Sequence, residues 1–239
     1  MNSLFSRYPS ILILLLGLAA WCGALMPSPI TEEETYDYLA IGNSITRHPV
    51  CEYWWNDIGM AASEENKDYF HIVTAHLQEE HGRVNAQAVN YVQWETARSK
   101  ERKKTFELID PYLTEELELI TLQLSENAAS SASLGRDYQR LILHLQEKCP
   151  QARIVLVDDF WSDDKSKVKK ETAEKLELPF ADLSGIRNDP AYQWTVGDIV
   201  YGSDGQPHAI DNDNVARHPN DLGMEYIAGQ IIRQLDALP

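Results

Sequence analysis

Apolar residues form two kinds of segment along the chain, namely short continuous runs and longer stripes with helical spacing. Short apolar runs bounded by glycine or polar residues are typical of strands that are buried on both faces. The predicted strands are residues 38–41, 84–92, 117–124, 153–157 and 178–183. The predicted helices are residues 64–80, 134–149, 163–176 and 220–238. Because strands and helices alternate, the pattern predicts a three-layer α/β/α fold around a central parallel sheet.

The first 26 residues differ in composition from the rest of the chain. One basic residue precedes an apolar run over residues 11–26. The run is shorter than a bilayer span, which needs about 20 residues, and it fits the apolar part of a secretory signal. Residues 1–26 are therefore expected to be a signal peptide or, alternatively, an uncleaved anchor that attaches the chain to a membrane through residues 8–26. Both alternatives predict a polar tether over residues 27–35 and one exported domain over residues 36–239.

The charge of the chain excludes some classes of partner. Its 37 acidic and 21 basic side chains give a formal net charge of −16. Such a surface repels nucleic acid and anionic lipid. The basic cluster at residues 98–104 is expected to be a solvated loop or the start of a helix. The composition thus predicts no nucleic-acid partner and favours neutral substrates such as sugars or acylated sugars.

Polar residues follow several predicted strands at the point where each strand ends. They are Ser44, Asn90, Asn127 and the pair Asp158 and Asp159, of which the two aspartates are expected to cap loop ends. In a parallel sheet, ligands bind beyond these carboxyl ends. A hydroxyl on the turn after a strand can be exposed beside backbone N–H groups that stabilise an oxyanion. Because Gly-Asn-Ser also fits a simple helix cap, Ser44 alone does not predict an activity.

Three blocks resemble signatures of the SGNH (GDSL-type) hydrolases. Residues 41–46, Ile-Gly-Asn-Ser-Ile-Thr, resemble the first signature, which usually reads Gly-Asp-Ser. Residues 122–127, Leu-Gln-Leu-Ser-Glu-Asn, resemble the third signature, commonly Gly-x-Asn-Asp. Residues 218–228 resemble the fifth, in which the catalytic histidine precedes a proline and a C-terminal helix. The resemblance spans roughly residues 36–237 and implies a flavodoxin-like α/β fold of the SGNH hydrolase type.

The resemblance implies roles for three residues. Ser44 becomes the nucleophile, and its own N–H becomes one donor of the oxyanion hole. The side chain of Asn127 becomes a second donor. His218 becomes the general base that takes the serine proton. The resemblance implies neither a cofactor nor a metal, and the sequence has no Cys/His cluster with the spacing of a zinc site.

Two departures concern the oxyanion side of the family pattern. Asn43 stands where the first signature usually has aspartate, a neighbour that is mainly structural in the family. The second signature normally supplies a glycine N–H, and residues 84–94 contain no glycine. Asn90 lies at the end of that predicted strand and is the alternative donor, through its side chain or its backbone.

The largest departure concerns the acid of the triad. Val215 stands three residues before His218, where the family usually has an acidic residue. There are two alternatives: Asp213 or Asp211 substitutes through a changed loop path, or a backbone carbonyl orients the imidazole. The leading hypothesis is a Ser44–His218 dyad, which would lower the rate without abolishing activity.

The remaining aromatic residues and cysteines are less informative. Trp54 and Trp55 are expected in the core rather than beside the site, whereas Trp161 follows a strand end and is a candidate for the cleft wall. Cys51 and Cys149 lie outside the leader. Export permits a disulfide between them, but two small buried apolar residues are the favoured interpretation.

These observations predict an exported serine esterase that hydrolyses short acyl esters, with O-acetyl groups on carbohydrate as the favoured substrate, through an acyl-enzyme on Ser44. An O-acyltransferase that uses the same site is one alternative. A non-catalytic carbohydrate-binding module on the same fold is another. The sequence does not predict an oligomeric state.

Overall fold

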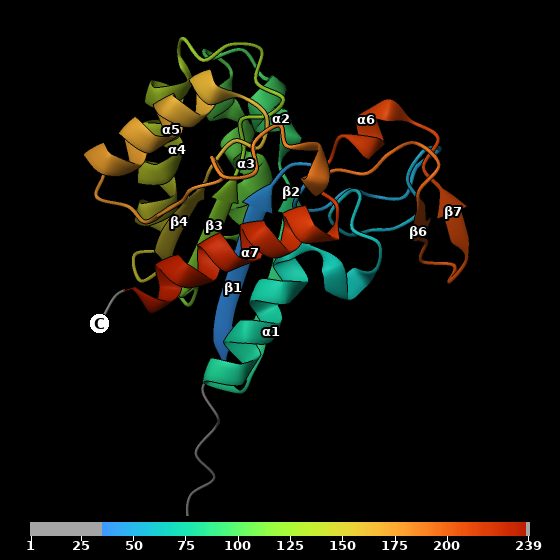
Figure 1. The fold of residues 1–239 in the computed structure, drawn as a ribbon. Coiled ribbons are helices and arrows are strands. Elements are labelled where there is room, and N and C mark those ends of the chain that lie inside the picture. Colours follow the sequence, from blue (N-terminus) through green and yellow to red (C-terminus); the bar gives the residue numbers. More distant parts are fainter. Residues whose placement is uncertain (1–34, 238–239) are drawn as a thin grey trace, which may run out of the picture. The chain divides into compact units, whose positions relative to one another are not determined.

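The computed structural model describes residues 35–237, which form a five-stranded parallel sheet (Figure 1). The strands are β1 (Tyr36–Gly42), β2 (Val84–Asn90), β3 (Leu119–Gln123), β4 (Arg153–Val157) and β5 (Phe180–Ala181). Their spatial order is β2-β1-β3-β4-β5, the flavodoxin-like order. The predicted parallel sheet is therefore confirmed.

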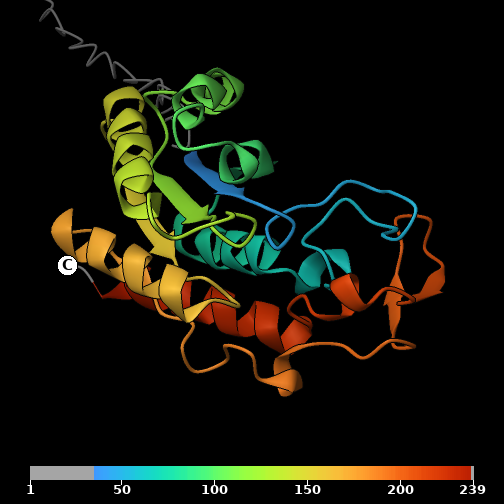
Figure 2. The same cartoon turned by 90° about the horizontal axis from the view of Figure 1, so that it is seen from above.

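Helices cover both faces of this sheet (Figure 2). On one face α1 (Tyr69–His81) packs against α7 (Asp221–Asp236). The other face carries α2 (Val92–Thr96), α3 (Phe106–Ile109), α4 (Leu134–Lys148) and α5 (Asp163–Lys175). Because side chains alternate along a strand, Tyr38 and Ala40 of β1 enter the core beneath α1 and α7, whereas Leu39 and Ile41 enter the core beneath α4. The predicted three-layer α/β/α fold is confirmed.

The register of the sheet brings distant segments of the sequence to one edge. Gly42, the last residue of β1, lies opposite Asn90 on β2 and Gln123 on β3. The residues that follow these strands therefore meet beyond the carboxyl ends of the sheet. Ser44 and Asn127 come from two of these loops.

Several predicted boundaries were wrong for local reasons. Strand β2 ends at Asn90 and helix α2 begins at Val92, because the Asn90 side chain accepts a hydrogen bond from the Val92 N–H at 3.1 Å. Helix α1 begins at Tyr69 rather than Glu64, because Asp68 accepts the His71 N–H at 2.8 Å and caps the helix. A separate 3-10 turn, Glu65–Lys67, precedes it. Strand β5 is shorter than predicted.

Two basic residues that were expected on the surface are buried. Arg102, in the predicted solvated cluster, is 5% exposed and pairs with Asp137 at 2.9 Å. Lys169 of helix α5, a type of side chain that is usually solvated, is fully buried, and its Nζ donates to the Leu124 carbonyl at 2.6 Å. A buried charge needs such partners, so both side chains bind groups that the sequence pattern did not identify.

The long connection before α7 has structure of its own. It contains a 3-10 helix (Pro190–Tyr192), the hairpin of β6 (Ile199–Tyr201) and β7 (Pro207–Ala209), and helix α6 (Asp213–Ala216). The hairpin is tied to the loop after β1, since the Tyr201 N–H donates to the Ser63 carbonyl at 2.8 Å. In Figure 1 these segments lie together beside the sheet, on the side to which the carboxyl ends of the strands point.

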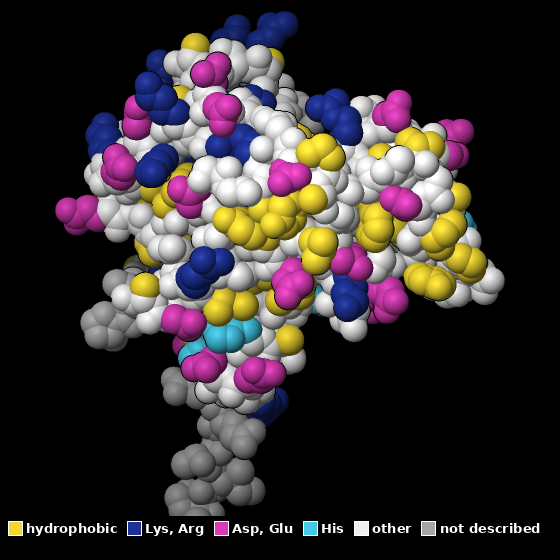
Figure 3. Space-filling model, viewed as in Figure 1, with side chains coloured by type: hydrophobic (Ala, Val, Ile, Leu, Met, Phe, Trp, Pro, Cys, Tyr) yellow, Lys and Arg dark blue, Asp and Glu magenta, His cyan; other side chains and the backbone are white. Residues whose placement is uncertain are grey.

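The leader and tether predictions, over residues 1–26 and 27–34, lie outside the described residues. Within residues 35–237 no helix is long and apolar enough to cross a membrane. Cys51 and Cys149 are both free thiols. On the face shown in Figure 3, acidic side chains are scattered among basic and apolar ones rather than gathered in one patch.

Candidate active site

The turn after β1 presents Ser44 at the edge of the sheet. The Asn43 side chain accepts the Ile45 N–H at 3.0 Å, and the Asn43 carbonyl accepts the N–H groups of Thr46 and Arg47 at 3.1 and 3.0 Å. The turn is tight because β1 ends in glycine. A Cβ at Gly42 would lie 1.7 Å from Oγ1 of Thr46. Asn43 thus has the structural role that was expected of this position.

Ser44 and His218 form a hydrogen-bonded pair, although 174 positions separate them in the sequence. The Ser44 Oγ lies 2.8 Å from Nε2 of His218. The other ring nitrogen, Nδ1, lies 2.7 Å from the main-chain oxygen of Asn214. A carbonyl oxygen only accepts hydrogen bonds, so Nδ1 carries the proton and Nε2 accepts from the serine hydroxyl. This is the tautomer that a general base requires.

The chain on both sides of His218 is held by caps. Asn212 accepts the Asn214 N–H at 2.8 Å and caps α6. Asn220 accepts the Gly223 N–H at 3.0 Å and caps α7. The amide of Asn220 also donates to the carbonyl of Gln193 at 2.9 Å. The capped N-termini of α6 and α7 thus hold the backbone on both sides of His218, which keeps its imidazole next to Ser44.

The protein environment makes His218 a weak base. Burial lowers the pKa of its imidazole from 6.5 to about 4, although the hydrogen bond to Asn214 acts in the opposite direction. Electrostatic repulsion from the nearby His48 and Arg217 side chains lowers the pKa of His218 further. The imidazole is therefore neutral at neutral pH and can accept a proton.

The structure does not bring a carboxylate to His218. Asp211 and Asp213 are both exposed, and the atom that either would have to bind, Nδ1, is occupied by the Asn214 carbonyl. Asp213 is the first residue of α6, and its side chain is left in solvent. Val215, at the family's usual acid position, is buried in the core. Asp213 thus makes no hydrogen bond to His218 in this structure, and the dyad stays a hypothesis.

Two candidate N–H donors belong to residues that line the pocket, Ser44 and Asn127. No hydrogen bond from the Ser44 N–H to another group of residues 35–237 is found, so this donor is free for a ligand. The side chain of Asn127 lines the same pocket, and one of its two amide hydrogens is held by Oε2 of Glu95 at 2.7 Å. Asn90 also lines the pocket, but its amide donates to the Arg47 carbonyl at 2.7 Å and stabilises the loop.

The pocket at Ser44 has a volume of about 320 Å³. It is lined by Ser44, His48, Tyr53, Met60, Asn90, Val92, Asn127, Asn212, Asn214, Val215 and His218. A second hollow of about 240 Å³ adjoins it and shares the residues Asn127, Asn214 and His218. Its outer wall is Trp161, whose ring centroid lies 5.1 Å from that of His218, edge to face. His218 therefore borders both hollows.

The three tryptophans considered in the sequence analysis lie in different places in the structure. Trp54 is fully buried in the core, and Trp55 stacks on His208 with a centroid distance of 4.7 Å. Neither lines the pocket at Ser44. Trp161 does lie at the site, where its Nε1 donates to the Arg217 carbonyl at 3.1 Å. Tyr53, which lines the pocket, had no distinguishing pattern in the sequence.

Buried carboxylates beneath the site were missed by sequence reasoning. Glu95 of α2 is 1% exposed, and Glu126 directly precedes Asn127. Removal from water and the nearby negative charges of Asp159 and Glu95 raise the pKa of Glu126 to about 8. The adjacent Asp159 accepts the N–H groups of Trp161 and Ser162 at 2.9 and 2.6 Å, which is the loop-capping role that was predicted for it.

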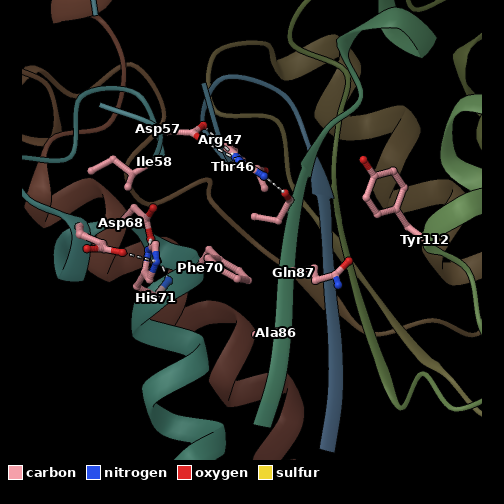
Figure 4. Close-up of a pocket in the computed structure, with 12 residues that line it drawn as sticks. Thr46, Arg47, Asp57, Ile58, Asp68, Phe70, His71, Ala86, Gln87 and Tyr112 are labelled. Carbon is pink, nitrogen blue, oxygen red and sulfur yellow. Dashed lines mark hydrogen bonds and ion pairs between the residues drawn. The ribbon is translucent and has the colours of Figure 1, made fainter. Parts of the chain in front are cut away.

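A separate cavity lies between β2, α1 and the loop after Ser44 (Figure 4). It measures about 280 Å³. Its charged groups are satisfied in pairs, since Arg47 holds Asp57 through two hydrogen bonds and Asp68 binds His71 at 2.7 Å. Neither Ser44 nor His218 lines it. The pocket at Ser44 is therefore the better candidate for catalysis, because it is lined by both residues. Within residues 35–237 no cluster of three potential metal ligands is found.

Comparison with known proteins supports the fold. No protein-family model matches the chain, and no curated protein matches it in sequence. A putative GDSL-like lipase from Parabacteroides merdae superposes with a TM-score of 0.55 at 14% identity, over 87% of this chain and 99% of that one. An acetylxylan esterase from Geobacillus stearothermophilus gives a TM-score of 0.53 at 14% identity, over 85% of this chain and 96% of that one.

A third similar structure is a two-domain esterase active on acetylated mannans. It gives a TM-score of 0.54 at 16% identity and covers 86% of this chain. The chain spans only about half of that esterase, since the match covers 50% of its length. The structural neighbours are thus esterases and lipases, and the described part of the chain has the SGNH (GDSL-type) hydrolase fold.

Proposed function

We propose that the chain is a serine esterase that uses Ser44 and His218 as a catalytic dyad. The observation that carries this proposal is the 2.8 Å contact between Ser44 Oγ and His218 Nε2, with Nδ1 held by a main-chain carbonyl. A nucleophile, a neutral base and two free N–H donors stand in one pocket. This arrangement suits acyl transfer from an ester.

The proposed reaction has two halves. Ser44 Oγ attacks the ester carbonyl carbon as Nε2 of His218 takes the hydroxyl proton. The N–H of Ser44 and the amide of Asn127 stabilise the oxyanion of the tetrahedral intermediate. The intermediate collapses when the bond to the alcohol breaks and His218 returns the proton to the alcohol oxygen. Water then attacks the acyl-enzyme, again with His218 as base, and releases the carboxylic acid and free Ser44.

For the substrate we propose short acyl esters, with O-acetyl groups on carbohydrate as the favoured class. Two structural neighbours are an acetylxylan esterase and an esterase active on acetylated mannans. The pocket at Ser44, of about 320 Å³, is large enough for a small acyl group. Trp161 lines the adjoining hollow, and flat aromatic rings suit contact with a sugar ring. The net charge of −16 suits a neutral substrate.

We further propose that the domain acts outside the cytoplasm. The apolar run at residues 11–26 supports export, either by a cleaved signal or by an anchor over residues 8–26. Fractionation of cells that express the full chain, followed by N-terminal sequencing, separates these two forms.

The activity is tested with the full-length chain on p-nitrophenyl acetate and on an acetylated xylo-oligosaccharide. Turnover is expected on both, with a loss of about 10³-fold or more in Ser44→Ala and in His218→Ala. A fluorophosphonate should label Ser44 in the wild type. No turnover and no labelling would exclude the esterase and favour a non-catalytic module. Transfer of acetyl to an added sugar, in place of acetate release, would favour an acyltransferase.

A further inference from the structure

Glu95 is a buried carboxylate that hydrogen-bonds the side chain of Asn43, next to Ser44, and the side chain of Asn127. It lies in α2, directly after β2, and is 1% exposed. Its Oε2 accepts the side-chain amide of Asn127 at 2.7 Å. Its Oε1 accepts the side-chain amide of Asn43 at 3.1 Å and the main-chain N–H of Ser125. One carboxylate thus joins the turn that carries Ser44 to the loop that carries Asn127.

The partners of Glu95 are neutral donors rather than cations. Among the described residues no lysine or arginine forms an ion pair with its carboxylate, and Arg102 donates instead to the main-chain oxygen of Glu95 at 3.1 Å. A buried carboxylate is costly unless its oxygens are hydrogen-bonded. The N–H donors around Glu95 are therefore held firmly, because each one that leaves exposes an unsatisfied charge.

The loop before Asn127 contains a residue in an unfavourable backbone conformation, Ser125, which its hydrogen bonds hold in place. Ser125 has a φ of +135°, a conformation that residues other than glycine rarely adopt. Its N–H is bound by Glu95, and its hydroxyl donates to Asp159 at 2.5 Å. Contacts on both sides maintain this backbone, which places Asn127 at the pocket.

The hydrogen bond between Glu95 and the Asn127 side chain also determines the direction of the second amide hydrogen of Asn127. The amide group is planar, so its two hydrogens have fixed directions once the oxygen and one hydrogen are placed. Oε2 of Glu95 holds one of them. Because Asn127 lines the pocket at Ser44, the other hydrogen is left for a ligand there. A hydrogen bond to a charged acceptor is stronger than a neutral one, so the amide is held in this orientation.

We infer that Glu95 is a positioning residue for the oxyanion hole, which orients the Asn127 amide and fixes it relative to the Ser44 turn. Glu95 itself touches no substrate. This inference rests on the proposed function, because it requires Asn127 to stabilise an oxyanion. It adds a residue outside the three sequence blocks that resemble the family signatures.

Glu126 offers a matched control. Its Oε2 also accepts from the Asn43 amide, at 2.7 Å, but its Oε1 accepts from Gln123 and from the Phe160 N–H at 2.7 and 3.1 Å. It has no hydrogen bond to Asn127. Glu126→Gln therefore perturbs the same polar network without removing the contact that the inference depends on.

The test is a double-mutant cycle in the full-length chain with p-nitrophenyl acetate as substrate. Asn127→Ala should lower kcat by about 10²-fold or more, as removal of an oxyanion donor does. Glu95→Gln should lower kcat by about 10-fold with KM within about twofold, because the lost interaction acts only in the transition state. The double variant should be no slower than Asn127→Ala alone. Glu126→Gln should keep kcat within about threefold of the wild type, within the spread of context-dependent effects.

Glu95→Asp is the second variant if Glu95→Gln does not fold, because it keeps the charge but moves it away from Asn127. Glu95→Asp should also lower kcat, and it should cause no further loss when it is combined with Asn127→Ala. Losses that multiply in the double variant, or an unchanged kcat in a folded Glu95 variant, would overturn the inference and leave the esterase intact. If Ser44→Ala retains full turnover, the proposed function itself fails, whatever the Glu95 variants do.

Discussion

The imidazole of His218 hydrogen-bonds through Nδ1 to the main-chain oxygen of Asn214, four residues earlier, at 2.7 Å. A carbonyl orients the ring as well as an acid does. It carries no full negative charge, however, so it stabilises the imidazolium less than a carboxylate would. Burial lowers the pKa of His218 to about 4, and the hydrogen bond to this carbonyl opposes that shift only in part. The geometry of a serine hydrolase is thus present without its usual electrostatic support.

The first prediction concerns the pH dependence of activity. Only neutral His218 can take the serine proton, and its pKa is lowered from 6.5 to about 4. Activity should therefore be retained as the pH falls through 6.5 and should decline only as it approaches 4. The kcat/KM for acetate release, measured from pH 3.5 to 8 with Ser44→Ala as background, checks this. A midpoint at or above 6.5 would reveal an ionic partner of His218.

The second prediction separates the base from the acidic residues near it. His218→Ala should reduce kcat by about 10³-fold or more, because no other imidazole contacts Ser44 Oγ among the described residues. Asp213→Asn should change kcat by less than about twofold, since the Asp213 side chain is exposed and an exposed substitution has small effects. Both rates are measured on the same ester, with Asp211→Asn as the matched variant.

A loss of about 10⁴-fold in Asp213→Asn, as expected for a true triad acid, would contradict the dyad. It would mean that α6 rearranges when substrate binds. The crystal structure of a phosphonylated enzyme would then show the Asp213 carboxylate at Nδ1.

The third prediction concerns the turn that presents Ser44. Gly42→Ala places a methyl group 1.7 Å from Oγ1 of Thr46 and 2.8 Å from the main-chain oxygen of Gln123. The backbone must shift, so the free energy of unfolding should fall by about 1–3 kcal/mol, and kcat should fall with it. Gly229→Ala in α7 is the control, because its nearest contact, Arg233 Nη2, is 3.9 Å away. That variant should be neutral or up to about 1 kcal/mol more stable.

Thermal unfolding and p-nitrophenyl acetate turnover are measured on both glycine variants. If both variants have the same stability and the same kcat, the close approach of Gly42 to Thr46 does not determine the conformation of the turn. If Gly42→Ala has normal stability but a low kcat, the substitution displaces Ser44 without destabilising the fold.

The fold follows from local patterns in the sequence, whereas the pairing of Ser44 with His218 was predicted from the resemblance of two sequence blocks to family signatures. Apolar runs and stripes predict the sheet and its covering helices because burial dictates them. The glycine before Asn43, and the proline after His218, mark the turn and the start of the last helix. These features are properties of neighbouring residues, so a single sequence contains them.

Other parts of the site depend on contacts between distant residues. Glu95 resembles any polar residue in a short helix until the fold places it under Asn127, 32 positions later. Lys169 has the pattern of a solvated residue, yet it reaches the Leu124 carbonyl. The role of the Asn214 carbonyl belongs to the backbone, and no side-chain pattern specifies it. Such long-range polar contacts have no periodicity that could predict them.

The last prediction tests whether the alcohol part of the substrate is a sugar. Trp161 and His218 both line the hollow that adjoins the pocket at Ser44. In the proposed reaction, a departing alcohol would receive its proton from His218. Trp161→Ala should lower kcat/KM for an acetylated xylo-oligosaccharide by about 5- to 10-fold, which corresponds to an aromatic contact of about 1 kcal/mol. Its kcat/KM for p-nitrophenyl acetate should change by less than about threefold, because the nitrophenol ring needs no specific wall.

Trp55→Ala is the matched control for Trp161→Ala, since Trp55 is also partly exposed but stacks on His208 away from Ser44. It should leave both kcat/KM values unchanged. Trp161→Phe should recover part of the loss on the oligosaccharide, because it restores a flat ring. Equal losses on both esters in Trp161→Ala would instead mean that the indole only supports the His218 ring, with which it packs edge to face. The esterase would then stand, but Trp161 would not determine its preference for carbohydrate.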